Sequence, residues 1–235
     1  MTYLLLHGGA GPASVAGFAS MLSATGADVR APAHPGFDGT PRPPELTTIR
    51  GLARHYAELL EKLSLDDVCV VGNSIGGWIA AELALLRSPR VSRLVIVDGV
   101  GIEVPGHPIA DFWSLTFDQV AALSYADPAR FAVKPPPSAL QNRETLQVYA
   151  SAMADPSLRD RLSAIDVPSL VIWGEADRIA DAEYGKAFAA AIPGAEFLLL
   201  ENAGHLPQIE APDRLLKAVR DFAAGSPAVP GRPRR

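Results

Sequence analysis

The stretch from Val68 to Leu85 reads VCVVGNSIGGWIAAELAL and decides the fold of the chain. Its first half is a short run of β-branched residues, typical of a buried strand, and its second half has helical periodicity. Gly72, Ser74 and Gly76 lie where the two halves meet. A strand that turns this sharply into a helix strains the serine, and side chains at the two glycine positions would collide. The stretch therefore predicts a nucleophile elbow at Ser74, although a serine at a helix start can also be only an N-cap.

Two later stretches follow predicted strands and carry an acid and a histidine. After SLVIW comes GEADRIA, which contains Asp177, and after EFLLL comes ENAGHLPQIEAP, which contains His205. A serine hydroxyl is a weak nucleophile at neutral pH, so an imidazole must take its proton and a carboxylate must orient that imidazole. Ser74, His205 and Asp177 can supply these roles. Glu175, two residues before Asp177, and Asp98, after the preceding strand, are the other candidate acids.

The three motifs, in the order serine, acid and histidine, resemble those of the α/β-hydrolase fold family. The family's Trp-Gly-x-x-Asp pattern maps onto residues 173–177, and its Gly-His-x-Pro-x-x-Glu-x-Pro pattern maps onto residues 204–212. The resemblance covers most of the chain. It implies that Asp177 is the triad acid, that His205 is the base and that the backbone N–H of Ile75 is one oxyanion donor.

The chain opens with LLLHGGAGP, from Leu4 to Pro12, a short apolar run followed by three glycines. Such a loop can bind a dinucleotide or complete an oxyanion hole. The dinucleotide pattern fits poorly, because Ser14 stands where its third glycine belongs and no acid closes the second predicted strand. We therefore expect neither a cofactor nor a metal ion. In the resembled family this loop gives the second oxyanion N–H, which points to Gly9, with Ala10 as the alternative.

Short β-branched or leucine-rich runs alternate with helical segments, which predicts an α/β fold with a mostly parallel, doubly wound sheet. Six strands are expected, at residues 3–6, 28–31, 68–71, 94–97, 170–173 and 196–199. Helices are expected after Pro12, over 49–63, after Ser74, around 182–191 and over 212–223. Most members of the resembled family begin with a β-hairpin for which this sequence has no residues. The sheet is then shortened at one edge, which favours edge pairing in a dimer.

Residues from about 100 to 155 break this alternation and predict a helical cap inserted into one α/β-hydrolase domain over residues 1–225. Phe112 and Trp113 in the cap are candidate pocket residues, together with Ala10 and Leu206. Residues 226–235 are rich in proline, and we expect them to form a disordered tail.

The composition describes an ordinary globular protein. With 235 residues, of which 48% are hydrophobic and 20% charged, the chain can bury a sizeable core. The net charge of -5 gives no basic excess for nucleic acid or an anionic membrane, and no apolar run is long enough to cross a bilayer. Cys69 is the single cysteine, which excludes an internal disulfide and indicates a cytoplasmic protein. We expect a monomer or homodimer that binds a small-molecule acyl substrate.

Together, the motifs predict a serine hydrolase that cleaves an ester, thioester or lactone of a small, fairly apolar acyl substrate. Dehalogenases and epoxide hydrolases of this fold have aspartate in place of Ser74, which argues against both. The GNSIGG segment also resembles carbon-carbon bond hydrolases of the same fold, but these generally have tryptophan where this chain has Leu206. An acyltransferase and a triad-bearing binding protein are further alternatives. Arg130 and Arg143 are candidate partners of a substrate carboxylate.

Overall fold

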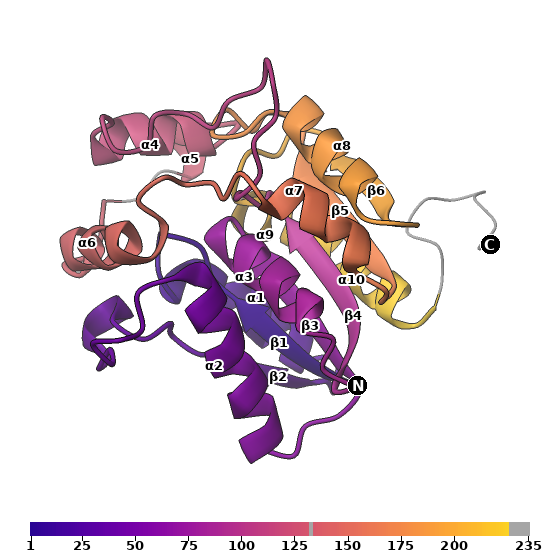
Figure 1. The fold of residues 1–235 in the computed structure, drawn as a ribbon. Coiled ribbons are helices and arrows are strands. Elements are labelled where there is room, and N and C mark those ends of the chain that lie inside the picture. Colours follow the sequence, from indigo (N-terminus) through magenta and orange to yellow (C-terminus); the bar gives the residue numbers. More distant parts are fainter. Residues whose placement is uncertain (132–133, 226–235) are drawn as a thin grey trace.

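One parallel sheet of six strands forms the centre of the molecule (Figure 1). The computed structural model describes residues 1–131 and 134–225, so the predicted tail, residues 226–235, lies outside the described residues. The strands run in the order β2-β1-β3-β4-β5-β6, and neighbouring strands are parallel throughout. Their bounds are β1 Thr2–Leu6, β2 Asp28–Arg30, β3 Val68–Asn73, β4 Val91–Val97, β5 Ser169–Gly174 and β6 Glu196–Leu200. The predicted parallel α/β sheet is confirmed.

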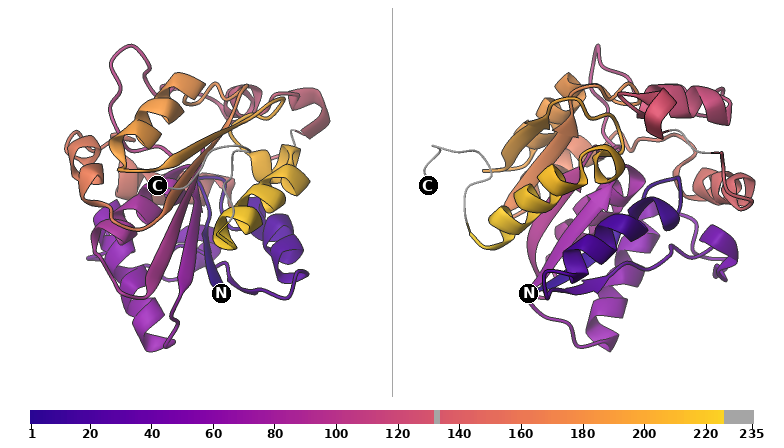
Figure 2. Two further views of the ribbon diagram at one scale, coloured as in Figure 1. Left: turned by 90° about the vertical axis from the view of Figure 1, so that its right-hand side faces the viewer. Right: turned by 180° about the vertical axis from the view of Figure 1, so that it is seen from behind.

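Helices cover both faces of this sheet (Figure 2). On β3, Val68 and Val70 face one hydrophobic core, and Cys69 and Val71 face the other. The first core lies under α2 (Ile49–Lys62), α3 (Ile75–Leu85) and α8 (Ala182–Ala191). The second lies under α1 (Ala13–Ser23) and α10 (Pro212–Ala223), and α9 (Pro207–Glu210) contacts both of these helices. None of the helices within residues 1–131 and 134–225 is long and apolar enough to cross a membrane.

The strand register brings distant segments to one edge of the sheet. Leu6 pairs with Gly72 across β1 and β3, and Gly174 pairs with Leu200 across β5 and β6. The loops that leave these strands therefore start at the same level. Because parallel strands all end at the same edge, the glycine loop, the serine, the acid and the histidine meet there.

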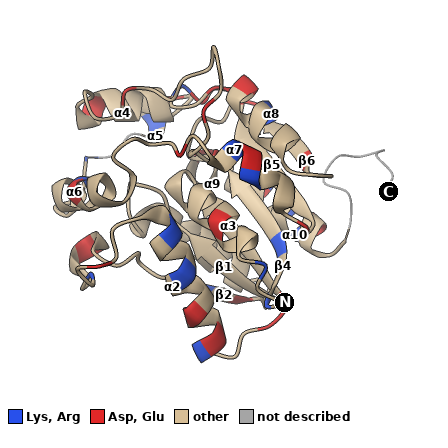
Figure 3. Cartoon of the chain, in the orientation of Figure 1, with Lys and Arg blue, Asp and Glu red and all other residues tan. Residues whose placement is uncertain are grey.

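The helix α2 shows how local sequence sets a boundary and a buried face. Thr48 caps its start, because its side-chain oxygen accepts the N–H of Gly51 at 3.0 Å. Apolar residues at helical spacing, Leu52, Tyr56 and Leu60 among them, are fully buried. Basic and acidic residues are interspersed along α2 in the view of Figure 3.

The edge strand β2 is short and carries charge at both ends. It has three residues, and Arg30 Nε lies 3.1 Å from Asp28 Oδ1. Short, charged edge strands are poor templates for pairing with another chain. The oligomeric state stays a prediction.

The connection from β4 to β5 holds the segment predicted as a cap. The α-helices of this connection are α4 (Phe117–Ser124), α5 (Pro128–Phe131), α6 (Ala139–Ala150) and, after the predicted cap, α7 (Leu158–Arg161). The segment leaves and rejoins the core at one point, where Gly101 forms a parallel bridge with Ala154 and accepts the N–H of Asp155 at 2.8 Å. From there α4, α5 and α6 lie beyond the carboxyl ends of the strands (Figure 1). The domain and cap boundaries themselves stay a prediction.

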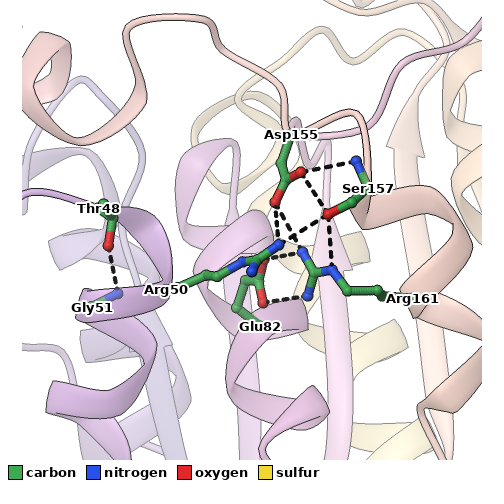
Figure 4. A network of polar contacts seen from close by, with 7 residues as sticks. All are labelled: Thr48, Arg50, Gly51, Glu82, Asp155, Ser157 and Arg161. Carbon is green, nitrogen blue, oxygen red and sulfur yellow. Dashed lines mark hydrogen bonds and ion pairs between the residues drawn. The ribbon is translucent and has the colours of Figure 1, made fainter.

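A network of charged side chains fixes the returning end of this segment (Figure 4). Arg161 binds Glu82 of α3 through two hydrogen bonds of 2.8 and 2.6 Å, and the Glu82 side chain is only 5% exposed. Asp155 binds Arg50 of α2 at 2.7 Å and Arg161 at 3.0 Å. Burial opposes ionisation of Asp155, but hydrogen bonds from Ser157 and the charge of Arg50 lower its pKa to about 2. The network joins α2, α3 and α7 beside the cap.

Replacing Glu82 with glutamine should lower the free energy of unfolding by about 2 kcal/mol, because Arg161 loses a buried carboxylate and keeps its charge. The partial exposure of Arg161, 30% of its side chain, keeps the loss below that of a fully buried pair. The matched control is Glu183→Gln, which breaks an exposed pair with Lys186 and should cost less than about 0.5 kcal/mol. Urea unfolding of both variants measures the difference, and equal losses would contradict a stabilising role of the network.

Candidate active site

Ser74 occupies a sharp turn between β3 and α3. Its φ and ψ angles are 57° and -122°, outside the regions that most residues adopt. The turn depends on two glycines, because a Cβ at Gly72 would lie 2.1 Å from the carbonyl oxygen of Gly76. A Cβ at Gly76 would lie 2.2 Å from the carbonyl oxygen of Leu6 on β1. This is the geometry that the sequence predicts for a nucleophile elbow.

The structure brings the three predicted triad residues into one hydrogen-bonded chain. His205 Nε2 lies 2.9 Å from Ser74 Oγ, and His205 Nδ1 lies 2.8 Å from Asp177 Oδ2. All three side chains are buried. The carboxylate accepts a hydrogen bond from the N–H at Nδ1, so Nε2 carries no proton and can accept that of the serine hydroxyl. This arrangement can activate a serine nucleophile, and the catalytic roles themselves stay a prediction.

The other two candidate acids do not bind the histidine. Glu175 lies on an exposed turn, where its carboxylate accepts the N–H of Asn202 at 3.3 Å. Asp98 Oδ1 accepts the N–H of Gly174 at 2.7 Å. Of the three acids that the sequence offers, only Asp177 is hydrogen-bonded to the imidazole.

The glycine loop after β1 lies against the serine. The N–H groups of Gly9, Ala10 and Ile75 donate to no protein acceptor in the described part of the chain, so all three are free to bind a substrate oxygen. A Cβ at Gly8 would lie 2.9 Å from Ser74 Cβ, whereas a Cβ at Gly9 would meet only the tip of one flexible side chain. The close approach therefore requires Gly8, which the sequence analysis did not single out. The choice between Gly9 and Ala10 as oxyanion donor stays open.

Two buried histidines hold this loop in place. His7 Nε2 accepts the backbone N–H of His34 at 2.9 Å, and its other ring nitrogen donates to the carbonyl of Gly8 at 2.8 Å. His34 in turn donates to the carbonyl of His7 at 2.9 Å and bonds the hydroxyl of Tyr56. Burial lowers the pKa of His7 to about 4 and that of His34 well below its usual range. Both rings are therefore neutral at pH 7, and their hydrogen bonds fix the backbone of this loop.

Asn73, directly before Ser74, anchors the loop that carries His205. Its Nδ2 donates to the carbonyl oxygens of Val97 at 3.1 Å and His205 at 3.0 Å. Its Oδ1 accepts Gln208 Nε2 at 3.0 Å. Sequence reasoning missed this role. The available signal was an amide side chain at the end of an apolar strand, where a buried polar group needs partners.

Glu210 joins the histidine loop to the end of α4. Its carboxylate accepts the N–H of Gly204 at 2.6 Å and that of Ala126 at 2.9 Å. Next to it, the N–H of His205 donates to the carbonyl of Ser124 at 2.7 Å. The predicted cap and His205 are thus in direct contact. The motif at residues 204–212 contains Glu210 but does not by itself indicate this contact.

A cavity of about 180 Å³ opens at Ser74 under α4 and α6. Its walls are largely apolar, and the predicted residues Ala10, Phe112 and Leu206 line it. Its lining also includes two cationic side chains, Lys134 and Arg143. The cavity therefore suits a small, mainly apolar molecule with an anionic group.

The expectation that Trp113 lines this cavity is wrong. Its indole N–H donates to the carbonyl of Ser151 at 2.7 Å, and the residue lines a neighbouring groove instead. Arg143 donates to the carbonyls of Phe112 at 2.8 Å and Trp113 at 2.9 Å, which fixes it at the cavity wall. Arg130, the other candidate arginine, lies over the ring of Phe131 and does not line the cavity.

Comparisons with known proteins agree with the fold. Residues 3–218 match the family described as "Alpha/beta hydrolase family". A 2-hydroxymuconate semialdehyde hydrolase of Pseudomonas putida is 30% identical over 257 aligned positions, which cover 96% of this chain and 88% of the relative. A 2-hydroxy-6-oxo-2,4-heptadienoate hydrolase of Pseudomonas putida (strain ATCC 700007 / DSM 6899 / JCM 31910 / BCRC 17059 / LMG 24140 / F1) is 28% identical, with 83% of this chain and 78% of the relative covered.

Solved structures with the same fold include two kinds of hydrolytic enzyme. An enzyme that degrades N-acyl homoserine lactone superimposes with a TM-score of 0.76 at 25% identity, over 94% of this chain and 93% of the other. A meta-cleavage product hydrolase superimposes with a TM-score of 0.78 at 21% identity, over 96% and 92% of the two chains. With the family match over most of its length, the chain belongs to the α/β-hydrolase family and is a hydrolase.

Proposed function

We propose that this hydrolase cleaves a carbon-carbon bond in a small 2-hydroxy-6-oxo-2,4-dienoate, with Ser74 as nucleophile, His205 as base and Asp177 as the group that orients it. The observation that carries the proposal is the resemblance to the semialdehyde and heptadienoate hydrolases over most of this chain. It supports the carbon-carbon alternative of the sequence analysis over the ester interpretation. The apolar cavity beside Ser74, with a cation in its wall, supports the same substrate class.

The site contains the groups that this reaction needs. In such a substrate, ketonisation of the 2-hydroxy group moves its proton to the carbon beside the 6-oxo carbonyl. Ser74 Oγ attacks that carbonyl while His205 takes the hydroxyl proton, and the N–H groups of Ile75 and of Gly9 or Ala10 stabilise the oxyanion. The bond between the attacked carbonyl carbon and the adjacent protonated carbon then breaks, and its electron pair passes into the dienolate. His205 returns the proton to the dienolate. Water hydrolyses the acyl group that remains on Ser74.

Arg143 is placed to bind the carboxylate of the dienoate. Two of its N–H groups are held by backbone carbonyls, and its guanidinium lies 5.0 Å from the centre of the Phe112 ring. A guanidinium that is already oriented loses little freedom on binding and can still offer other N–H donors to a carboxylate. The carboxylate end of the substrate then lies at the cap, and its 6-oxo end lies at Ser74.

The test compares 2-hydroxy-6-oxo-2,4-heptadienoate with para-nitrophenyl butyrate and N-hexanoyl homoserine lactone. We expect kcat/KM for the dienoate to exceed that for either comparison substrate by about 100-fold or more, since only the dienoate uses both ends of the cavity. Arg143→Gln should raise KM for the dienoate by about tenfold to 100-fold. The neutral ester serves as the matched substrate and should be affected less. Turnover of the esters without consumption of the dienoate would contradict the proposal.

Lactone or ester hydrolysis is the second candidate function. It is supported by the fold shared with the lactone-degrading enzyme at 25% identity and by Leu206, which replaces the tryptophan of the carbon-carbon hydrolases. The same comparison of substrates decides between the two functions, because the lactone has no carboxylate for Arg143 to bind. An acyltransferase would be recognised by product formation with an added alcohol.

A further inference from the structure

A second buried carboxyl group lies beside the predicted triad. Asp98 follows β4 and is fully buried. One of its oxygens, one oxygen of Asp177 and a ring nitrogen of His205 lie within 4.8 Å of one another. Asp98 Oδ1 accepts the N–H of Gly174 at 2.7 Å, whereas Oδ2 has no hydrogen-bond donor among the described residues. A buried carboxylate oxygen without a donor is costly, and a proton on the carboxyl group removes the cost.

The donors around the two carboxyl groups decide which of them holds the negative charge. Two carboxylates this close in a buried site repel each other strongly, so one of them retains a proton. Asp177 accepts backbone N–H groups from Ile179 at 2.8 Å and Ala180 at 3.2 Å. It also accepts the ring N–H of His205, so it has three donors, whereas Asp98 has one. The charge is therefore better stabilised on Asp177, and the proton belongs on Asp98.

We propose that Asp98 is a neutral carboxylic acid in the working enzyme and donates its hydroxyl proton in a hydrogen bond to the carboxylate of Asp177. Asp98 is then a positioning residue, since it acts on His205 only through Asp177. The bond gives Asp177 a further donor and keeps a second negative charge away from the imidazole. The inference rests on the proposed function, because it takes Ser74, His205 and Asp177 as the reacting groups.

The electrostatic surroundings of Asp98 agree with this assignment. Burial first, and then the negative charge of Asp177, raise the pKa of the Asp98 carboxyl well above its usual range, and the N–H of Gly174 acts in the opposite direction. The titratable groups that face Asp98 are Asp177, His205 and, with a smaller effect, Glu210. None of these offers Asp98 a positive charge while His205 is neutral.

Asp98→Asn tests the protonation state through stability, without any use of turnover. Asparagine has the shape of the neutral acid, can accept the Gly174 N–H and can donate to Asp177. In the wild type, the pKa of Asp98 is higher in the folded than in the unfolded chain, so folding is favoured most at low pH and weakens as pH rises between the two values. D98N has no such proton. The unfolding constant of the wild type, divided by that of D98N, should rise about tenfold per pH unit between pH 5 and 7.

The matched control replaces another aspartate that is hydrogen-bonded in the folded protein, Asp38. Hydrogen bonds from Asn142 and Ser138 lower the pKa of Asp38, so its carboxyl is ionised in both states above pH 5. Asp38→Asn should therefore differ from the wild type by the same factor at pH 5, 6 and 7, as measured by urea unfolding. A ratio for D98N that is equally flat over this range would overturn the proposal.

The pH dependence of kcat/KM supplies the second readout. D98N should keep the midpoint of the acid limb, because it replaces a neutral donor with a neutral donor. Asp98→Ala removes the donor, leaves Asp177 a stronger partner of the imidazolium, and should raise that midpoint by about 0.5 unit or more. A lower midpoint in D98N would show that Asp98 carries a negative charge in the wild type, which the substitution removes, and would overturn the proposal. An unshifted midpoint in D98A would also overturn it. If Ser74 is not the nucleophile, the proposed function fails, but the effect of D98N on stability is unchanged.

Discussion

Replacing Ser74 with alanine should reduce kcat by about 10⁴- to 10⁶-fold, for the dienoate and for an activated ester alike. The reason is that alanine keeps the Cβ in the strained turn and removes only the oxygen that we propose attacks the substrate. The oxygen lies 2.9 Å from His205 Nε2 in a buried site, and no other serine or cysteine is bonded to that imidazole in the described ranges. Steady-state rates of the purified variant, measured beside the wild type, give the loss directly.

The control for this variant is its stability. Ser74 has a positive φ of 57°, and alanine must adopt the same conformation, so backbone strain is equal in the two proteins. The free energy of unfolding, measured in urea, should therefore stay within about 1 kcal/mol of that of the wild type. A fluorophosphonate probe should label the wild type and leave the variant unlabelled. Undiminished turnover in the variant would show that another group is the nucleophile, and an unlabelled wild type would support the binding-protein alternative.

Replacing Gly76 with alanine should destabilise the protein by about 3 kcal/mol or more and remove its activity. The added Cβ would lie 2.2 Å from the carbonyl oxygen of Leu6 and 2.7 Å from that of His7. Both are backbone atoms at the end of β1, so no rotamer change relieves the collision. The strand end must move, and with it the loop that carries Gly9 and Ala10. The serine turn and the predicted oxyanion donors are therefore disturbed by one methyl group.

Gly17→Ala is the matched control for the glycine substitution. Gly17 lies within α1, and a Cβ added there meets no atom within 4 Å. Alanine should stabilise this helix by up to about 1 kcal/mol, because it has less freedom than glycine in the unfolded chain. Circular dichroism and urea unfolding of the two variants separate the effect of the elbow from that of losing a glycine. Equal stability of the two variants would show that the elbow tolerates a side chain.

Much of the fold follows from local patterns in the sequence. Five of the six strands are short apolar runs, β2 being the charged exception, and five of the helices lie where helical periodicity or a cap indicates them. The boundaries follow less closely from these patterns: β4 begins at Val91, three residues before the expected start at Leu94. The short helix α9 was not expected, because four residues carry too little periodicity to register.

The sequence by itself determined the elbow and the two loops that complete the predicted triad. At Gly72 an added Cβ would meet Gly76, so the short motif specifies much of the turn, and the end of β1 adds the constraint at Gly76. Asp177 and His205 each follow a strand of the same parallel sheet, and parallel strands end at one edge. Local chemistry and simple topology were therefore sufficient for these residues.

Only the tertiary structure decided what surrounds them. The partners of Asn73 and Glu210 lie 132 and 84 residues away along the chain, in His205 and Ala126. The place of Trp113 outside the cavity depends on a bond to Ser151, 38 residues on. Such contacts are set by how segments that are far apart in the sequence pack together, and no periodicity in either segment encodes the other.

The same holds for Asp98, the acid that the sequence could only offer as a rival to Asp177. Both follow a strand and both are buried, so residue type and position do not separate them. The number of N–H groups around each carboxyl does. Two of those on Asp177 come from its own loop, whereas the N–H groups of His205 and Gly174 come from other segments of the folded chain. The sequence supplied two acids, and the packing of the loops that meet at the sheet edge assigned the charge to one and the proton to the other.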